Sequence, residues 1–443
     1  MDIMAFLICL DNCIDKTTLS RLATIVDAML SMTGRVTMLG ISRWTEQGGS
    51  YRTIQRFFNT SITWYKINWF LIRKALTGMK EILLIADETV VTKSGKHTFG
   101  VDRFFSSILN KPVSSISFFS LSLLDVQNET SYSIMTEQIE KEKKNTENKG
   151  KKKKAKKKKN SSKKAPKGRK KGSKNKDKKN VALSSYHLWA QGLIKKVLNL
   201  IGAEIELRIF VFDGAFGNNE SLQMVKQCGL ELISKLRYDS ALWFPYTGQY
   251  AGRGAYKKYG EKLDYTNISK KHLVSSETKG NVRTDIYNIQ LWHKNFPELL
   301  NIVVIKKTNI MTNKVAHVVL FSSDLELHWN KIITYYRLRF QIEFNFRDAK
   351  QHWGLEDFMN IKEKPVYNGA NLSMFMVNLS QILLQNQSVG LLSMNDLKTW
   401  FRGHKYMRTI IKLLPKDTDQ TIIQELQNEL SEIGRINLVK NAA

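Results

Sequence analysis

Two continuous apolar segments, each ended by an aspartate, constrain the fold of this chain more than any other feature. They read ILLIAD at residues 82–87 and LRIFVFDG at residues 207–214. A strand with one solvated face alternates apolar and polar residues, whereas a strand buried on both faces reads as an unbroken apolar run. Both segments therefore predict interior strands of an α/β sheet. Functional side chains of α/β folds commonly follow the ends of such strands, where Asp87 and Asp213 stand.

Hydrophobic periodicity predicts further elements around these two strands. Apolar and aromatic residues indicate strands at 114–126 and 230–236 and an amphipathic helix at 186–201. Short β-like stretches follow, and the chain turns helical again from about residue 328. The predicted parts are a helical N-terminal domain, the first part of an α/β core, a mainly β insertion, the last part of the core and a helical C-terminal region, and they span residues 1–77, 78–237, 238–325, 326–365 and 366–443.

The positive charge is concentrated in one segment. The formal net charge is +29, and residues 141–180 hold 22 lysines and arginines against three acidic residues. The rest of the chain carries 47 basic and 37 acidic residues and is only moderately basic. A run of like charges cannot form a core, so it predicts a disordered insertion, either a solvated linker or a tether for a phosphate backbone. The overall balance favours a polyanionic partner such as nucleic acid.

The cysteines and the apolar segments indicate a cytoplasmic protein without a membrane partner. Cys9, Cys13 and Cys228 form an odd, sparse set with no zinc-like spacing, so we interpret them as reduced core residues. The N-terminal segment IMAFLICL is too short to span a bilayer and follows an acidic residue. No other segment is apolar over the length that a membrane helix requires.

The segment YYRLRFQIEFNFRDAK, residues 335–350, is predicted to be one helix with an unusual polar stripe. At about 100° per residue, one side of the helix carries Tyr336, Arg339, Glu343 and Lys350. Apolar residues border this stripe, and they are Leu338, Ile342, Phe346 and Ala349 on one side and Phe340 and Phe344 on the other. The arc predicted to face water holds Arg337, Gln341, Asn345 and Asp348. Such a stripe is expected at a cleft, and an intramolecular pair between Arg339 and Glu343, four residues apart, is the alternative.

Three carboxylates of the chain could meet in one place. Asp87 and Asp213 each end a buried strand, and Glu343 lies on the stripe of the later helix. Oxygen ligands without histidine or cysteine suit Mg²⁺, or Mn²⁺ in its place, better than zinc. Two such ions about 3.5–4 Å apart can activate an attacking oxygen and stabilise a leaving one in phosphodiester cleavage. In a basic protein this cluster would act on nucleic acid.

The motif residues carry a resemblance to a known family. The stripe fits Y-x2-R-x3-E-x6-K at every spacing, and it resembles the signature around the third acid of DDE transposases from bacterial cut-and-paste insertion sequences. The stretch ADETVVTKSGK around Asp87 resembles the family's first-acid block, and FDGAFGNN around Asp213 resembles its second. The likeness covers residues from near 20 to near 360, and the lysine-rich run departs from it.

This resemblance implies a ribonuclease-H-like core: a mixed sheet flanked by helices, with a mainly β insertion between the second and third acids. It implies that Asp87, Asp213 and Glu343 are catalytic and bind two Mg²⁺ ions. The residues that it assigns to DNA contacts are Tyr336, Arg339 and Lys350. It also implies double-stranded DNA partners, namely transposon ends and target DNA, and a homodimer in the DNA complex, to which the C-terminal region could contribute.

Two further DNA contacts are predicted with an open alternative. Arg52 and Arg56 lie one helical turn apart within residues 1–77, whose glycine-broken helices resemble a helix-turn-helix arrangement. Plain helix packing would produce the same pattern. In relatives that cut through a hairpin, a tryptophan of the insertion stacks near a flipped base; Trp292 is the candidate here, and a core position is its alternative.

Three functions are compatible with these features. The first is a transposase of an insertion sequence, acting on nucleoid-associated DNA. The second is a catalytically inactive DNA-binding protein derived from such an enzyme, which would keep the basic surface without cutting. The third is a nuclease of the same fold, which would cut DNA that lacks the element's ends and would join no strands.

Overall fold

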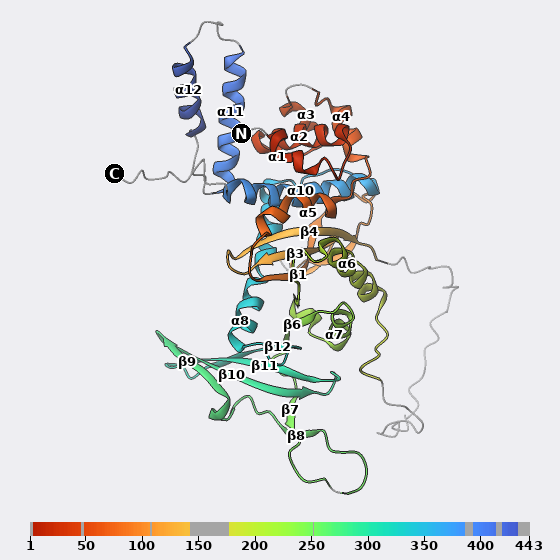
Figure 1. Ribbon diagram of the computed structural model, residues 1–443, viewed down its shortest axis with the longest axis vertical. Helices are drawn as coiled ribbons and strands as arrows, with labels where there is room; N and C mark the ends of the chain where they lie inside the picture. Colours follow the sequence, from red (N-terminus) through yellow and green to blue (C-terminus); the bar gives the residue numbers. More distant parts are fainter. Residues whose placement is uncertain are drawn as a thin grey trace, which may run out of the picture.

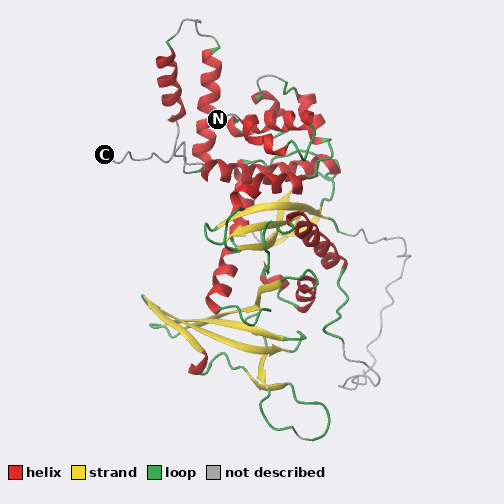
Figure 2. Cartoon of the chain, in the orientation of Figure 1, coloured by secondary structure: helices red, strands yellow, loops and turns green. Residues whose placement is uncertain are grey.

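The computed structural model shows a mixed α/β protein built around one large sheet with helices on its faces (Figures 1 and 2). It describes residues 3–45, 48–106, 109–141, 177–250, 252–385, 393–412 and 419–432. Most of the lysine-rich run, residues 142–176, lies outside the described residues, so the prediction of a disordered insertion stays a prediction.

The sheet contains both parallel and antiparallel strands in the order β2-β3-β1-β5-β6-β12-β11-β10-β7-β8, with β4 paired to β3 and β9 to β10. Its strands are β1 Ile82–Thr92, β2 Asp102–Ser106, β3 Lys111–Asp125, β4 Thr130–Ile139, β5 Ile209–Val211, β6 Glu231–Leu236, β7 Leu242–Pro245, β8 Tyr259–Lys262, β9 Leu273–Lys279, β10 Val282–His293, β11 Leu299–Asn309 and β12 Val315–Ser322. The strands of the β insertion extend the core sheet, because β12 pairs with β6.

The helices are α1 Ile3–Leu7, α2 Lys16–Ser31, α3 Met38–Trp44, α4 Tyr51–Phe58, α5 Trp64–Leu76, α6 Ser185–Ile201, α7 Asn219–Lys226, α8 Trp329–Leu338, α9 Gln341–His352, α10 Glu363–Gln385, α11 Met394–Ile411 and α12 Gln420–Glu432. Several begin at polar caps, among them Asp15, Ser184 and Asn218. Within the described part of the chain, none of these helices is long and apolar enough to cross a membrane.

The predicted strands and helices of the core are present, with two differences. Strand β1 continues five residues beyond Asp87, so this aspartate lies within the strand and does not end it as predicted. The strand at 82–87, the strand at 230–236 and the helix at 186–201 are confirmed as β1, β6 and α6. The prediction of one unbroken helix through residues 335–350 is wrong, because α8 ends at Leu338 and α9 begins at Gln341. The amides of Phe340, Ile342 and Glu343 bond to carbonyls three residues earlier, so a tighter turn interrupts the α-helical pattern here.

The two faces of the core sheet receive different helices. Phe119 of β3 packs its ring against Trp189 of α6 and against Phe212, which follows β5. Strand alternation turns the neighbouring residues Ser120 and Asp213 to the opposite face. On that face Ser120 bonds to Thr136 of β4, and helices α9 and α10 pack against β4. Asp87, within β1, and Asp213, after β5, therefore face α9.

Asparagine side chains cover the outer edge of β4. Asn378 of α10 accepts a hydrogen bond from the Ser133 amide at 2.9 Å and donates one to the Ser133 carbonyl at 2.7 Å. Asn371 of α10 donates to the Thr136 carbonyl, and Asn345 of α9 donates to the Ser131 carbonyl. These amides replace the partners that a further strand would supply.

Asn378→Ala is expected to lower the free energy of unfolding by about 3 kcal/mol, because it leaves the buried Ser133 amide and carbonyl without partners. Urea denaturation followed by circular dichroism measures the change. Ser380→Ala is a matched control: Ser380 is equally buried on the same helix, but among the described residues its hydroxyl bonds only to the Met376 carbonyl one turn earlier. Equal losses in the two variants would contradict the role of Asn378.

Candidate active site

The parallel pairing of β1 and β5 brings two aspartates side by side. Leu84 pairs with Phe210 and Ile85 with Val211. Asp87 and Asp213 each follow two residues after the second pair, so both side chains leave the sheet on the same face and at the same level. This placement follows directly from the two apolar strands that the sequence predicts.

The turn after Asp213 is held close to β6. The Asp213 carbonyl accepts a hydrogen bond from the Ser234 hydroxyl at 2.9 Å. A Cβ atom at Gly217 would lie 2.2 Å from the Lys235 carbonyl oxygen, so only glycine fits this position. The glycines of FDGAFGNN thus allow the chain to leave Asp213 and return along β6 without moving the carboxylate.

Arg339 holds all three predicted acids together. Its Nη1 atom lies 2.7 Å from Asp87 Oδ2, and its Nη2 atom lies 3.1 Å from Glu343 Oε1 and 3.8 Å from Asp213 Oδ1. The arginine side chain is 9% exposed, whereas the carboxylates are 20% to 42% exposed. Both interpretations of the stripe are therefore present: the acids converge, and the pair between Arg339 and Glu343 exists. The guanidinium lies at the centre of the cluster.

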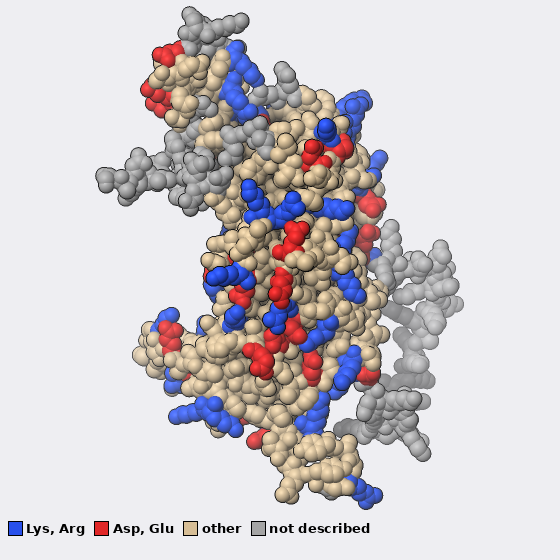
Figure 3. All heavy atoms as spheres, viewed as in Figure 1, with Lys and Arg blue, Asp and Glu red and all other residues tan. Residues whose placement is uncertain are grey.

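Burial and mutual proximity set the charges of this cluster. Burial raises the pKa of Asp87 above its ordinary value, and the Arg339 guanidinium opposes that rise. Burial likewise raises the pKa of Glu343. Burial alone would lower the pKa of Arg339, but the surrounding carboxylates outweigh it and raise that pKa. On the face shown in Figure 3, acidic side chains gather along the centre with lysines and arginines beside them.

Tyr336 lies at this cluster, whereas Lys350 is anchored elsewhere. Burial and the nearby Asp213 raise the pKa of Tyr336 to about 12. The Arg339 guanidinium carbon is 5.8 Å from the centre of the Tyr336 ring. Lys350 donates from Nζ to the Val90 carbonyl at 2.9 Å and pairs with Glu356 at 3.6 Å. Of the signature residues, three therefore meet and the lysine binds the far part of β1.

The donor set fits a hard divalent cation, but the side chains are arranged around an arginine. The cluster offers carboxylate oxygens without histidine or cysteine, which is the set that Mg²⁺ prefers. In the part of the chain that the structure describes, no three His, Cys, Asp or Glu side chains are close enough to share an ion. The Arg339 Nε atom is buried without a partner among these residues. Ion binding by all three acids therefore requires the guanidinium to move aside.

The surroundings of the stripe differ from the prediction at several residues. Asn345 was predicted to face water but is buried, because it bonds to Ser131 of β4 and to Gln381 of α10. Phe340 and Phe344 were predicted to wall the cleft, yet both are exposed and contact each other edge to face. Periodicity missed the burial of Asn345 because the buried polar residues of β4 and the asparagines of α10 form a polar interface inside the protein.

Trp292 lies near the end of β10, within an aromatic neighbourhood. It pairs across strands with Trp243 of β7, and its ring is 6.2 Å from that of Tyr259. Lys258 Nζ lies 3.4 Å from the centre of the Trp292 ring. Among the described residues, no hydrogen bond, ion pair or ring contact joins Trp292 to the acidic cluster, and its predicted stacking on a base stays a prediction.

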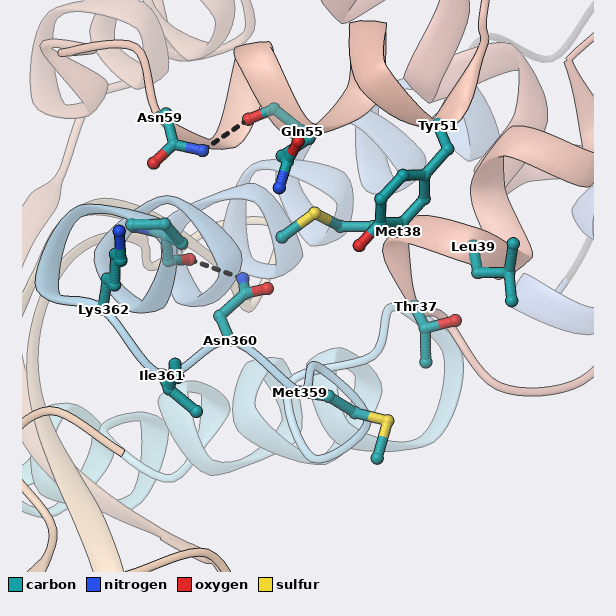
Figure 4. Close-up of a pocket in the computed structure, with 11 residues that line it drawn as sticks. Thr37, Met38, Leu39, Tyr51, Gln55, Asn59, Met359, Asn360, Ile361 and Lys362 are labelled. Atoms are coloured by element: carbon teal, nitrogen blue, oxygen red, sulfur yellow. Dashed lines mark hydrogen bonds between the residues drawn. The ribbon is translucent and has the colours of Figure 1, made fainter. Parts of the chain in front are cut away.

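Helix α4 borders a groove near the N-terminus (Figure 4). The groove has a volume of about 440 Å³, and it is lined by Tyr51 and Gln55 of α4 and by Asn59, which caps the end of that helix. Arg52 and Arg56 are exposed on the same helix outside that lining. Neither arginine makes an ion pair within the described ranges, so both guanidinium groups are available to phosphates.

Arg52→Ala combined with Arg56→Ala is expected to weaken DNA binding and to lower the slope of log affinity against log salt by about 2, because two phosphate contacts are lost. Fluorescence anisotropy over a salt series measures both effects. Lys16→Ala, which removes an exposed cation from α2, is the matched control. An unchanged slope in the double variant would leave plain packing as the role of α4.

Comparison with known proteins assigns the family. A family model described as DDE superfamily endonuclease matches residues 9–295, more than half of the chain. The match includes Asp87 and Asp213 and ends before the helix that carries Glu343. Comparison with curated proteins found no match. With two aspartates of the matched region facing a glutamate across one guanidinium, the chain belongs to the DDE superfamily endonucleases.

Proposed function

We propose that this endonuclease is the transposase of an insertion sequence and that its core is ribonuclease-H-like. The convergence of Asp87, Asp213 and Glu343 on Arg339 is the observation that supports the proposal most strongly. The neighbouring strands β4, β3, β1, β5 and β6, with antiparallel pairs on one side of β1 and parallel pairs on the other, support the core assignment.

Asp87, Asp213 and Glu343 would hold two Mg²⁺ ions, or Mn²⁺ in their place, and bound ions would supply Lewis-acid activation of oxygen. In the first reaction, water attacks a phosphorus atom at the element's end, the bond to the 3′ oxygen breaks, and a free 3′-hydroxyl remains. That hydroxyl then attacks a second phosphodiester, in the opposite strand or in target DNA. Each reaction replaces one phosphorus–oxygen bond with another.

Arg339 and Tyr336 would position the phosphate that reacts. The guanidinium has five donors, and its buried Nε is without a partner among the described residues, so it can bind phosphate oxygens once it leaves the acids. The Tyr336 hydroxyl keeps its proton at neutral pH and can donate to a phosphate oxygen. Lys350, held at Val90 and Glu356, would contact the transposon end farther from the cut.

The helical N-terminal part, with exposed Arg52 and Arg56, would bind the element's ends. Two copies would act together on the DNA, with helices α11 and α12 as a candidate contact. The reaction would take place on nucleoid DNA in the cytoplasm.

A cleavage assay on three DNA substrates tests the proposal. One labelled duplex carries the terminal repeat that flanks the gene, the second carries a scrambled repeat, and the third is an unlabelled target for joining. Mg²⁺-dependent cutting at the repeat's end, followed by joining to the target, is the expected result. Equal cutting of the scrambled duplex without joining would identify a general nuclease, and binding without cutting would identify a DNA-binding derivative.

A further inference from the structure

A tyrosine-rich loop projects from the insertion between β7 and β8. We call the described residues 246–250 and 252–258 the tyrosine loop; they include Tyr246, Tyr250 and Tyr256 with Arg253 and a pair of lysines. In Figure 1 it forms the long excursion at the bottom of the molecule, beyond the end of the sheet. It therefore lies at the end of the molecule opposite the N-terminal helices.

Hydrogen bonds within the loop order its aromatic rings. The Tyr250 hydroxyl donates to the Gly254 carbonyl at 2.7 Å, and the Tyr256 hydroxyl donates to the Gly248 carbonyl at 3.4 Å. The rings of Tyr250 and Tyr256 stack at 6.0 Å with an interplanar angle of 18°. Their exposed fractions are 52% and 60%. The hydroxyl hydrogen bonds of Tyr250 and Tyr256 thus keep their two stacked rings exposed to solvent.

Lys257 and Lys258 of the loop, and Lys294 after β10, lie over aromatic rings in the loop and beside it. Lys257 Nζ lies 4.7 Å from the centre of the Tyr246 ring, and Lys294 Nζ lies 4.2 Å from that of Trp243. Lys258 lies over Trp292, and Lys294 Nζ is also 5.9 Å from the centre of the Tyr259 ring, so the three lysines make four cation–aromatic contacts. None of the three lysines pairs with a carboxylate within the described residues.

The end of the lysine-rich run adds charge at the same place. Burial lowers the pKa of Lys258, and the nearby charges of Lys178 and Lys179 lower it further. Those two residues are the last lysines of the run, so its C-terminal end lies beside the tyrosine loop. Clustered like charges repel one another, and a polyanion bound there would relieve that repulsion.

We propose that the tyrosine loop and the lysines beside it form a binding site for unpaired nucleotides of DNA. Bases would stack on Tyr250 and Tyr256, and Lys257, Lys258 and Lys294 would contact the phosphates. A duplex keeps its base faces stacked on each other and offers nothing for exposed aromatic rings, whereas an unpaired strand offers both bases and phosphates. The choice of DNA as the polyanion depends on the proposed function.

Binding of a fluorescently labelled single strand and of the same sequence as a duplex, both in EDTA, tests the site. Tyr250→Ala with Tyr256→Ala is expected to weaken single-strand binding at least about tenfold, because two stacked bases lose their partners. Duplex binding is expected to change less than about twofold. Lys257→Gln with Lys258→Gln should lower the salt slope for the single strand by about 1.4, or about 0.7 per phosphate contact.

Tyr250→Phe with Tyr256→Phe is the matched control for loop structure. It removes the same hydroxyl hydrogen bonds as the alanine variant but keeps the rings, so it should retain single-strand affinity within about threefold. Equal losses in the Ala and Phe variants, equal losses for strand and duplex, or no loss at all would each overturn the proposal. Unfolding of either variant is detected by circular dichroism.

The two proposals fail separately. If the alanine variant binds a single strand like the wild type while the wild type cuts at the terminal repeat, only the tyrosine loop proposal fails. If the wild type binds the strand through the loop but cuts no DNA with Mg²⁺, only the transposase proposal fails.

Discussion

Glu343→Gln is expected to reduce metal-dependent DNA cleavage by about 10³-fold or more while DNA affinity in EDTA stays within about threefold. Glutamine keeps the size of the side chain but removes the negative charge that would hold a divalent ion. Glu343 enters the cluster from a separate helix, so its loss leaves β1 and β5 unchanged. The cleavage rate on DNA with the terminal repeat, measured with Mg²⁺ and with Mn²⁺, gives the result.

Glu88→Gln is the matched control for this experiment. Glu88 directly follows Asp87, but strand alternation places it on the opposite face, where its carboxylate accepts a hydrogen bond from Tyr186 at 2.6 Å. We expect this variant to cut within a few-fold of the wild-type rate. Similar losses in both variants would mean that the charge of β1, and not the convergent cluster, determines activity. Full activity of Glu343→Gln would remove Glu343 from the catalytic set.

Arg339→Gln is expected to destabilise the metal-free protein by about 3 kcal/mol at neutral pH, because a buried guanidinium that compensates three carboxylates is lost. Divalent cations should then stabilise the variant more than the wild type, since no arginine competes for the carboxylates. Urea denaturation in EDTA and in Mg²⁺ measures both quantities. Arg339→Lys, which keeps one charge without the planar fork, should fall between the two proteins.

The destabilisation of Arg339→Gln should depend on pH with a defined sign. Without the guanidinium, the folded-state pKa values of Asp87 and Glu343 would rise further above their ordinary values of 3.8 and 4.5. A raised carboxyl pKa costs stability above that pKa and nothing where both states are protonated. The difference in the free energy of unfolding between variant and wild type should therefore close as the pH falls through the raised pKa values of Asp87 and Glu343. A gap in stability that is constant with pH would show that the charges of the carboxylates do not cause it. No gap at pH 7 would show that the three ion pairs contribute nothing.

The sequence was sufficient for the strands that carry the site but insufficient for the packing around it. ILLIAD and LRIFVFDG have no polar face, so only an interior position suits them, and parallel pairing then brings Asp87 and Asp213 together. In contrast, β4 was not predicted, because its serines and threonine are buried against asparagine amides that come from distant helices. The turn between α8 and α9 was also missed, since no proline or glycine marks it.

The position of Arg339 shows why the site itself could only be partly anticipated. Its spacing from Glu343 predicted one ion pair, and the sequence gives no distance to Asp87 or Asp213. Those contacts depend on how α8 and α9 pack against the sheet, which is a property of the whole fold. The three acids can therefore be recognised from the sequence as a set, but the position of the Arg339 guanidinium between them requires the structure.

The asparagine amides along β4 also limit how this protein can associate with itself. An exposed strand edge is a template on which another molecule can add its own strand, as happens in sheet-extended dimers and in fibrils. Here Ser131, Ser133 and Thr136 already have side-chain partners for backbone groups along that edge. A second copy gains no hydrogen bonds from these groups by lying beside β4. Sheet extension is therefore blocked at these groups, and the α/β core is protected from edge-to-edge aggregation along this part of β4.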